Sequence, residues 1–282
     1  MKQRNFIVAF AAALVLAACA SVPPQSQQLA ANFKAMQPTS GLSKDMTIEE
    51  ASQIRDGLVA ELSASQGKVV GYKAGLTNPA VQKRFGHNSP VRGVLLEKML
   101  LDDGAEVPVK FAAIPFFEAD LVVVVKDEGV NQAKTPAEVL KHIASIRPFI
   151  ELPDLVTAKE QPLSGPIITA FNVGARLGVL GKPLAPNAAP DMVDALGKMM
   201  VVMRDQDGKE LAKVPGAAIL GHPLNAVVWL AEDMAKSGGK LRAGDILSLG
   251  SFTPPNFPKA GSVITVTYEG LPGNPSVSVR FK

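Results

Sequence analysis

The spacing of apolar residues changes from helical to strand-like along the chain. The capping box Thr47-Ile48-Glu49-Glu50 precedes apolar residues at helical spacing, which predicts a helix over about 47–64. Further on, the run Leu121 to Val125 has the length and β-branching of a buried strand. The pattern therefore predicts a helical start followed by strands.

Turn signals divide the rest of the chain into further short elements. We predict a strand from Val69 into a glycine-bearing loop, a capped helix from Thr135 to about 146, a strand pair over 167–180, a hairpin through Asp207-Gly208, a helix over 226–235 and strands from about 244 to 281. Many strands with few helices indicate an α+β chain with a rolled or sandwiched sheet.

The N-terminal segment has the layout of an export signal. Lys2 and Arg4 precede an apolar run, Phe6 to Ala18, that is too short to span a bilayer, which takes about 20 residues. The run ends in Leu16-Ala17-Ala18-Cys19, which resembles the signal of bacterial lipoproteins, with an ordinary secretory signal as the alternative. We therefore expect export.

Cleavage before Cys19 would leave that residue as a lipidated N-terminus, and several acyl chains anchor a protein stably in a membrane. The expected division is a signal peptide over 1–18, a lipidated tether over 19–40, in which Leu29 to Met36 could form a short helix, and a single domain over 41–282. Because Ala20 follows Cys19, the outer membrane is favoured over the inner membrane of the cell envelope. The domain is then expected to face the periplasm or the exterior.

Charge and cysteine content exclude several functional classes. Without Lys2 and Arg4, 27 basic residues remain of 29 against 26 acids, a formal charge of +1, so no basic face for nucleic acid is expected. Cys19 is the single cysteine, and its lipidation would leave no thiol for a disulfide, a zinc site or a nucleophile. Catalysis must then rest on other groups.

Three acids are candidates for a metal site. Glu118 and Asp120 lie two residues apart at the start of the predicted strand and therefore point to the same face, and Glu151 ends a second apolar run. Three carboxylates suit a hard divalent cation such as Mg²⁺ or Mn²⁺. From spacing alone, strand-end acids that face water are an open alternative.

Lys73 and His222 are candidates with ordinary structural alternatives. Lys73 lies between apolar residues and glycines, where its stem could pack on apolar surface while the ammonium reaches water. His222 precedes Pro223 at the start of a predicted helix, where a capping role is at least as natural as proton transfer.

Several motifs in one order carry a family resemblance. They are Gly71-Tyr72-Lys73 with Gly75-Leu76-Thr77, Glu118-x-Asp120, Glu151, Leu220 to Asn225 with Val228-Trp229-Leu230-Ala231, and Gly244-Asp245-Ile246. Together they resemble the 2-keto-4-pentenoate hydratases of the fumarylacetoacetate hydrolase superfamily, near relatives of the 2-oxo-3-hexenedioate decarboxylases. The resemblance covers about 47–282 and implies a mixed β-sandwich roll with a few peripheral helices.

The resemblance also implies roles for individual residues. Glu118, Asp120 and Glu151 would bind Mg²⁺ or Mn²⁺, with Asp120 standing where the family has a glutamate. Lys73 and His222 would be catalytic. The residues that would bind the small 2-oxo acid substrate are Leu76, Asn172 and Ser251.

Two positions depart from the family pattern. Val91 stands where the hydratases carry a proton-transfer acid, and Phe171 replaces an acid before Asn172. The resemblance implies a metal-dependent hydratase of a 2-oxo or 2-hydroxydienoic acid. The alternatives are a 2-oxo acid decarboxylase of the same superfamily and, because of these two departures, a catalytically impaired oxo-acid-binding lipoprotein. Assembly into a homo-oligomer is left open.

Overall fold

The computed structural model describes residues 23–282. The helices are α1 (Pro24–Ala35), α2 (Ile48–Gln66), α3 (Pro79–Arg84), α4 (Pro136–Lys141), α5 (Gly165–Ala170), α6 (Met192–Lys198) and α7 (Asn225–Lys236). Short 3₁₀ turns are η1 (Glu97–Met99), η2 (Glu128–Gln132), η3 (Asn172–Gly174) and η4 (Gly216–Ala218). The predicted signal peptide, 1–18, and Cys19 lie outside the described residues.

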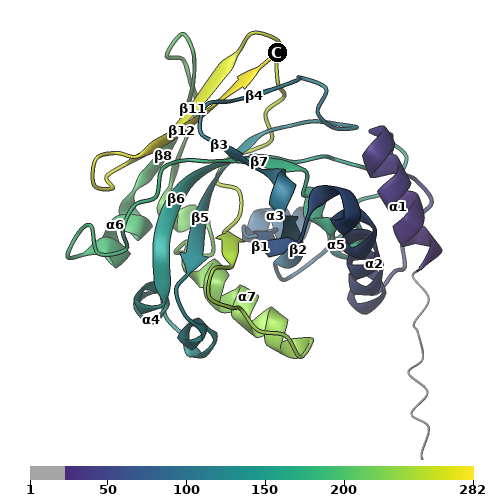
Figure 1. The fold of residues 1–282 in the computed structure, drawn as a ribbon, viewed down its shortest axis with the longest axis horizontal. Coiled ribbons are helices and arrows are strands. Elements are labelled where there is room, and N and C mark those ends of the chain that lie inside the picture. Colours follow the sequence, from purple (N-terminus) through teal and green to yellow (C-terminus); the bar gives the residue numbers. More distant parts are fainter. Residues whose placement is uncertain (1–22) are drawn as a thin grey trace, which may run out of the picture.

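A seven-stranded mixed sheet forms the centre of the molecule (Figure 1). Its strand order is β2 (Val91–Leu96), β1 (Val69–Gly75), β10 (Ile246–Ser248), β5 (Glu118–Val125), β6 (Ile143–Leu152), β7 (Leu177–Leu180) and β3 (Leu100–Asp102). The predicted valine-rich strand is β5, which lies between β10 and β6 and is buried along most of its length. It pairs antiparallel with both neighbours.

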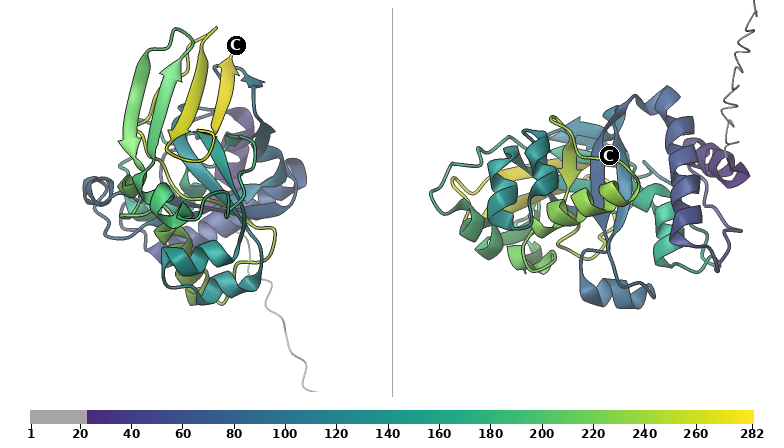
Figure 2. Two further views of the ribbon diagram at one scale, coloured as in Figure 1. Left: turned by 90° about the vertical axis from the view of Figure 1, so that its left-hand side faces the viewer. Right: turned by 90° about the horizontal axis from the view of Figure 1, so that it is seen from below.

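A second sheet of five strands stands beside the first, as the side view in Figure 2 shows. Its order is β4 (Ala105–Val107), β12 (Ser276–Phe281), β11 (Val263–Glu269), β8 (Met200–Asp205) and β9 (Glu210–Pro215). The inward residues of β11, including Val266 and Tyr268, join the main apolar core with residues of β5, β6 and α7. The predicted hairpin at Asp207-Gly208 is β8–β9.

The segment expected to be a tether is part of the folded domain from Pro24 onward. Helix α1 buries Leu29, Ala30 and Phe33 in a second apolar cluster that also contains residues of α2, α5 and β2. Ser26 donates from its hydroxyl to the carbonyl of Ile54 in α2 at 2.7 Å. Burial of this apolar stripe outweighs the polar composition that suggested a tether.

The predicted strand pair over 167–180 is wrong in its first half. Residues Gly165–Ala170 form helix α5, because Ser164 accepts a hydrogen bond from the amide of Ile167 and Pro166 stands in the first turn. Only the second half, Leu177–Leu180, is a strand, β7. The helices predicted near 47–64 and 226–235 are confirmed as α2 and α7.

The observed architecture confirms an α+β chain with sheets packed in layers and few helices. Within residues 23–282, none of the helices combines the length and the apolar character that a bilayer crossing requires.

Candidate active site

Two of the three candidate acids stand directly opposite each other. Glu118 is the first residue of β5, and its register partner across the antiparallel pair is Glu151 of β6. Asp120 follows two residues later on β5 and therefore shares the face of Glu118. The pairing of β5 with β6 thus brings together acids that are far apart in the sequence.

Lys73 reaches the same cluster from β1. Its ammonium forms an ion pair with Glu151 and donates a hydrogen bond to the carbonyl of Val173 at 2.9 Å. Strands β1 and β6 are separated by β10 and β5 in the sheet, so this contact requires the sheet to curl around the site. Gly93 leaves room for the lysine stem, since a Cβ there would lie 2.8 Å from Lys73 Cγ.

Asp120 is fully buried and held by hydrogen bonds from β10 and the loop that follows it. The Ser248 hydroxyl donates to Oδ2, and the Gly250 amide donates to Oδ1 at 3.0 Å. Burial raises the pKa of Asp120 to about 6, although these hydrogen bonds and Lys73 favour the charged form. The Tyr268 hydroxyl donates to the Asp120 carbonyl, which joins the second sheet to this strand.

Glu118 and Glu151 complete the cluster. Desolvation raises the pKa of Glu118 to about 7, opposed by the attraction of Lys73 and a hydrogen bond from Ser251. Glu151 is 6% exposed, and its Oε1 lies against the Lys73 ammonium without accepting a further hydrogen bond from a described residue. Desolvation also lowers the pKa of Lys73 to about 8.

The donor set suits a hard divalent cation. Three ionised carboxylates and one ammonium sum to −3 + 1 = −2, and excess buried negative charge favours a bound cation. Across 23–282, no three His, Cys, Asp or Glu side chains are gathered in coordinating positions. The reason is local, because Asp120 is directed at Ser248 and Glu151 at Lys73.

Leu76 and Ser251 both lie in segments next to these acids. Leu76 follows β1 with a left-handed φ of 54°, and its carbonyl accepts a hydrogen bond from the Gln82 side chain at 2.8 Å. The Ser251 hydroxyl carries one proton, which it donates either to the carbonyl of Thr253, at 2.7 Å, or to the Glu118 carboxylate. Their substrate-binding roles stay predictions.

The side chains of Asn172 and His222 are occupied by backbone groups. Asn172 accepts from the Val94 amide at 2.7 Å and donates to the Val94 carbonyl at 2.9 Å. His222 contacts the Val193 carbonyl through Nε2 at 2.8 Å and accepts from the Leu224 amide at Nδ1 at 3.1 Å. These contacts give both residues a structural role, and their predicted substrate-binding and catalytic roles stay predictions.

Both departures from the family pattern lie in apolar surroundings. Val91 is 2% exposed and stands opposite Gly75, two residues beyond Lys73 on the same face of β1. Val91 and Phe171 belong to the apolar cluster that contains α1, α2 and α5. No acid therefore occupies either position beside the site.

Sequence reasoning missed Ser248 and Tyr268. Ser248 follows Gly244-Asp245-Ile246 at strand spacing from Ile246, so alternation along β10 could have placed it on the inner face. Nothing local marks Tyr268, because its contact with Asp120 joins residues 148 positions apart.

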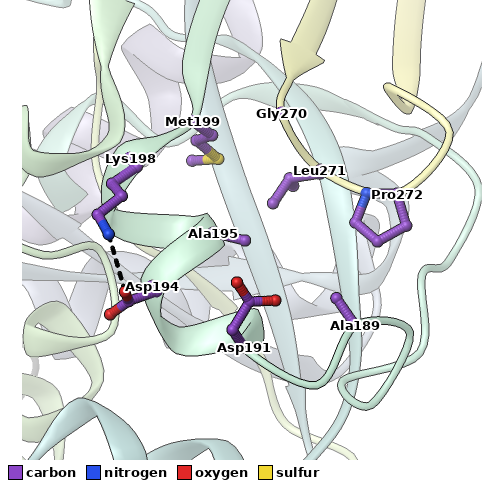
Figure 3. Close-up of a pocket in the computed structure, with 9 residues that line it drawn as sticks. All are labelled: Ala189, Asp191, Asp194, Ala195, Lys198, Met199, Gly270, Leu271 and Pro272. Carbon is purple, nitrogen blue, oxygen red and sulfur yellow. Dashed lines mark hydrogen bonds and ion pairs between the residues drawn. The ribbon is translucent and has the colours of Figure 1, made fainter.

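A separate hollow of about 430 Å³ lies at α6 and the β11–β12 turn (Figure 3). Its lining residues are Ala189, Asp191, Asp194, Ala195, Lys198, Met199, Gly270, Leu271 and Pro272. At its rim, Asp194 and Lys198 form an exposed ion pair of 2.8 Å. Since it contains none of the acids described above, it is not the candidate active site.

Comparison with known proteins gives relatives across most of the chain. No family model matches it. The chain is 34% identical over 204 residues to a 2-keto-4-pentenoate hydratase of Burkholderia vietnamiensis, covering 72% of this chain and 76% of the relative.

Solved structures agree on the fold. The chain is similar to 4-oxalocrotonate decarboxylase from Pseudomonas putida G7, complexed with magnesium and adipate, with a TM-score of 0.81, 25% identity, and coverage of 92% and 96% of the two chains. Fumarylpyruvate hydrolase from Pseudomonas aeruginosa, in complex with Mn²⁺ and pyruvate, matches with a TM-score of 0.54 at 13% identity, covering 74% of this chain and 88% of that chain. The expected superfamily fold is confirmed.

Proposed function

We infer that this chain, which belongs to the family of the 2-keto-4-pentenoate hydratases, is a divalent-metal-dependent hydro-lyase acting on a small 2-oxo or 2-hydroxydienoic acid. The observation that carries the proposal is the convergence of Glu118, Asp120, Glu151 and Lys73 on the inner face of one curled sheet. The hydratase relatives supply the reaction class, and the geometry supplies residues able to perform it.

Glu118, Asp120 and Glu151 would hold the ion, for which Mg²⁺ and Mn²⁺ are the candidates. Their oxygens match the preference of hard cations, and the decarboxylase of similar fold is complexed with magnesium. When bound, such an ion supplies Lewis-acid stabilisation of negative charge on a substrate oxygen.

Lys73 has two roles in the proposed reaction. Its ammonium balances the buried carboxylates, and it offers positive charge to an anionic substrate that approaches them. The Val173 carbonyl holds the ammonium in place through the 2.9 Å hydrogen bond. Because desolvation brings the Lys73 pKa to about 8, this group can also exchange a proton near neutral pH.

Two alternatives have specific support. Decarboxylation is supported by the similarity in fold and sequence to the 4-oxalocrotonate decarboxylase of P. putida. Binding of an oxo acid without turnover is supported by Val91 and Phe171, whose apolar side chains stand where the family resemblance implies acids.

Lipid anchoring through Cys19 is also part of the proposal. Its support is the sequence Leu16-Ala17-Ala18-Cys19 after a short apolar run. Helix α1 begins five residues after Cys19, so an anchored chain would hold its domain close to the membrane surface.

We extend the proposal to self-association into a homo-oligomer, which analytical ultracentrifugation would test.

The decisive assay follows 2-hydroxypenta-2,4-dienoate with the soluble protein from Ser21 onward, with and without Mg²⁺. Mg²⁺-dependent loss of the dienoate with formation of the hydrated product supports the hydro-lyase. Mg²⁺-dependent binding of a 2-oxo acid with no turnover supports the binding protein. Turnover that is unchanged by chelators would contradict the metal-dependent proposal.

A further inference from the structure

Asp154 joins the two chain segments that carry the opposed glutamates. It lies three residues beyond Glu151 and is 1% exposed. Its Oδ2 accepts a hydrogen bond from the Ala113 amide at 3.1 Å, and its Oδ1 accepts one from the Ile114 amide at 2.9 Å. Residues 113–117 lead directly into Glu118, so one side chain links the exit of β6 to the entry of β5.

The backbone around Asp154 reinforces the same junction. An isolated bridge pairs Asp154 with Pro115, and the Asp154 amide donates to the Gly174 carbonyl at 2.9 Å. Gly174 follows Val173, whose carbonyl accepts the hydrogen bond from Lys73. Asp154 therefore contacts the segments that position Glu118, Glu151 and the lysine.

The chemistry of this junction requires a carboxylate. A carboxylate is acceptor-only, so each of its oxygens can meet one backbone N–H. An asparagine would turn its amide nitrogen toward one of these donors and leave that N–H without a partner. Burial of a carboxylate is costly unless hydrogen bonds compensate it, and here both oxygens accept one.

We propose that Asp154 is a positioning residue for the metal site, which sets the placement of Glu118 relative to Glu151. The inference rests on the proposed function, because it concerns the ion that those carboxylates would hold. Residues that orient metal ligands typically change metal affinity by about 10–100-fold when they are replaced. We expect an effect of this size from Asp154→Asn.

The experiment measures Mn²⁺ binding to the full chain by calorimetry, together with circular dichroism and thermal unfolding. Asp154→Asn should raise the Mn²⁺ dissociation constant about 10–100-fold while the spectrum remains native. Asp154→Glu keeps two acceptor oxygens on a longer stem and should fall between the wild type and the asparagine variant. In turnover, saturating Mn²⁺ should restore the rate of Asp154→Asn.

Gln161→Ala is the matched control. Gln161 is also buried, and its side chain joins both backbone groups of Leu42, at 3.0 and 3.1 Å, in a segment that carries none of the acids. This variant should lose stability and keep the wild-type Mn²⁺ affinity. Equal loss of affinity in both variants, or unchanged affinity in Asp154→Asn, would overturn the inference.

The metal site and the positioning role of Asp154 can be refuted separately. A wild-type protein that binds no Mn²⁺ would refute the metal site itself. Wild-type binding that persists unchanged in Asp154→Asn would refute only the positioning role. If Asp154→Asn does not fold, the comparison of Asp154→Glu with Gln161→Ala decides, because an unchanged Mn²⁺ affinity in Asp154→Glu would equally refute that role.

Discussion

Replacing Lys73 with methionine should destabilise the metal-free protein in a strongly pH-dependent way. The substitution keeps an apolar stem of similar length but removes the ammonium that contacts Glu151 and the Val173 carbonyl. Lys73 is 3% exposed, so solvent screens this pair weakly. Removing one partner of a buried ion pair typically costs about 3–5 kcal/mol, and we expect that loss at pH 7, below the Lys73 pKa of about 8, where the ammonium is charged.

The loss should shrink as the pH falls. The pKa of Glu118 is about 7 and that of Asp120 about 6, both raised by burial. A carboxyl group whose pKa is higher in the folded than in the unfolded protein stabilises the folded state at pH values below its unfolded-state pKa. This stabilisation is lost as the pH rises through its folded-state pKa. Between pH 7 and pH 5 both acids take up protons while Lys73 stays charged, so the destabilisation by Lys73→Met should fall to about 1 kcal/mol.

A divalent ion should compensate for the missing ammonium. We therefore expect Mn²⁺ to raise the unfolding temperature more in Lys73→Met than in the wild type, because the bound ion now meets no neighbouring positive charge. Turnover should fall even where the metal binds, since the charge offered to the substrate is gone.

Urea unfolding followed by the fluorescence of Trp229 measures these free energies at pH 5 and pH 7, with and without Mn²⁺. Lys134→Met is the control, because the Lys134–Glu232 pair is exposed and such pairs contribute about 0–1 kcal/mol. An equal loss at both pH values, together with no added effect of Mn²⁺, would refute the view that Lys73 balances the buried acids.

Four further predictions follow from the site and the N-terminus. Glu118→Ala, Asp120→Ala and Glu151→Ala should each weaken Mn²⁺ binding, and Glu151→Ala should also lose stability because it leaves the buried Lys73 ammonium without its partner; calorimetry that shows intact binding in all three would mean that the carboxylate site is wrong. In the wild type, Mn²⁺ affinity should rise with pH between about 5 and 8, as Asp120 and Glu118 lose protons with pKa values of about 6 and about 7, and Glu118→Gln should flatten the upper part of that curve. Val91→Asp should raise a slow rate of dienoate hydration by about 10²-fold or more if the family's acid is needed, measured as the initial rate in Mg²⁺; efficient hydration by the unmodified protein would show that another group carries the proton. Cys19→Ala should move the protein out of the membrane fraction, and unchanged fractionation would remove the lipidation proposal.

The elements most visible in the sequence were those with a strong local signal. The capping box at Thr47 and the β-branched run of β5 are local determinants, and both elements form as expected. At 167–170 the apolar run suited a strand equally well, and the Ser164-Gly165-Pro166 start signal decides for a helix. For α1, a short helix over Leu29 to Met36 could be foreseen, but its packing into the domain through Leu29 and Phe33 depends on distant elements, which composition alone could not show.

In the candidate site, too, local features could be predicted from the sequence and long-range contacts could not. Glu118 and Asp120 share a face because strand periodicity dictates it, and their approach to Glu151 follows from strand pairing. The engagement of Asn172 by Val94 could not be foreseen, because the two residues are 78 positions apart and the contact depends on the packed structure. An asparagine held by backbone groups and one that binds a substrate look alike in sequence.

The contacts that complete the acid cluster join residues far apart in the sequence, so the metal site forms only after most of the chain is available to fold. Ser248 and Tyr268 reach Asp120 from 128 and 148 residues away, and Lys73 reaches Val173 across 100. Such non-local contacts form slowly, and a chain still emerging from the ribosome lacks the segments that close the cluster. Metal loading is therefore a late event of folding, and the ion pool of the compartment where the complete chain folds decides which ion it takes.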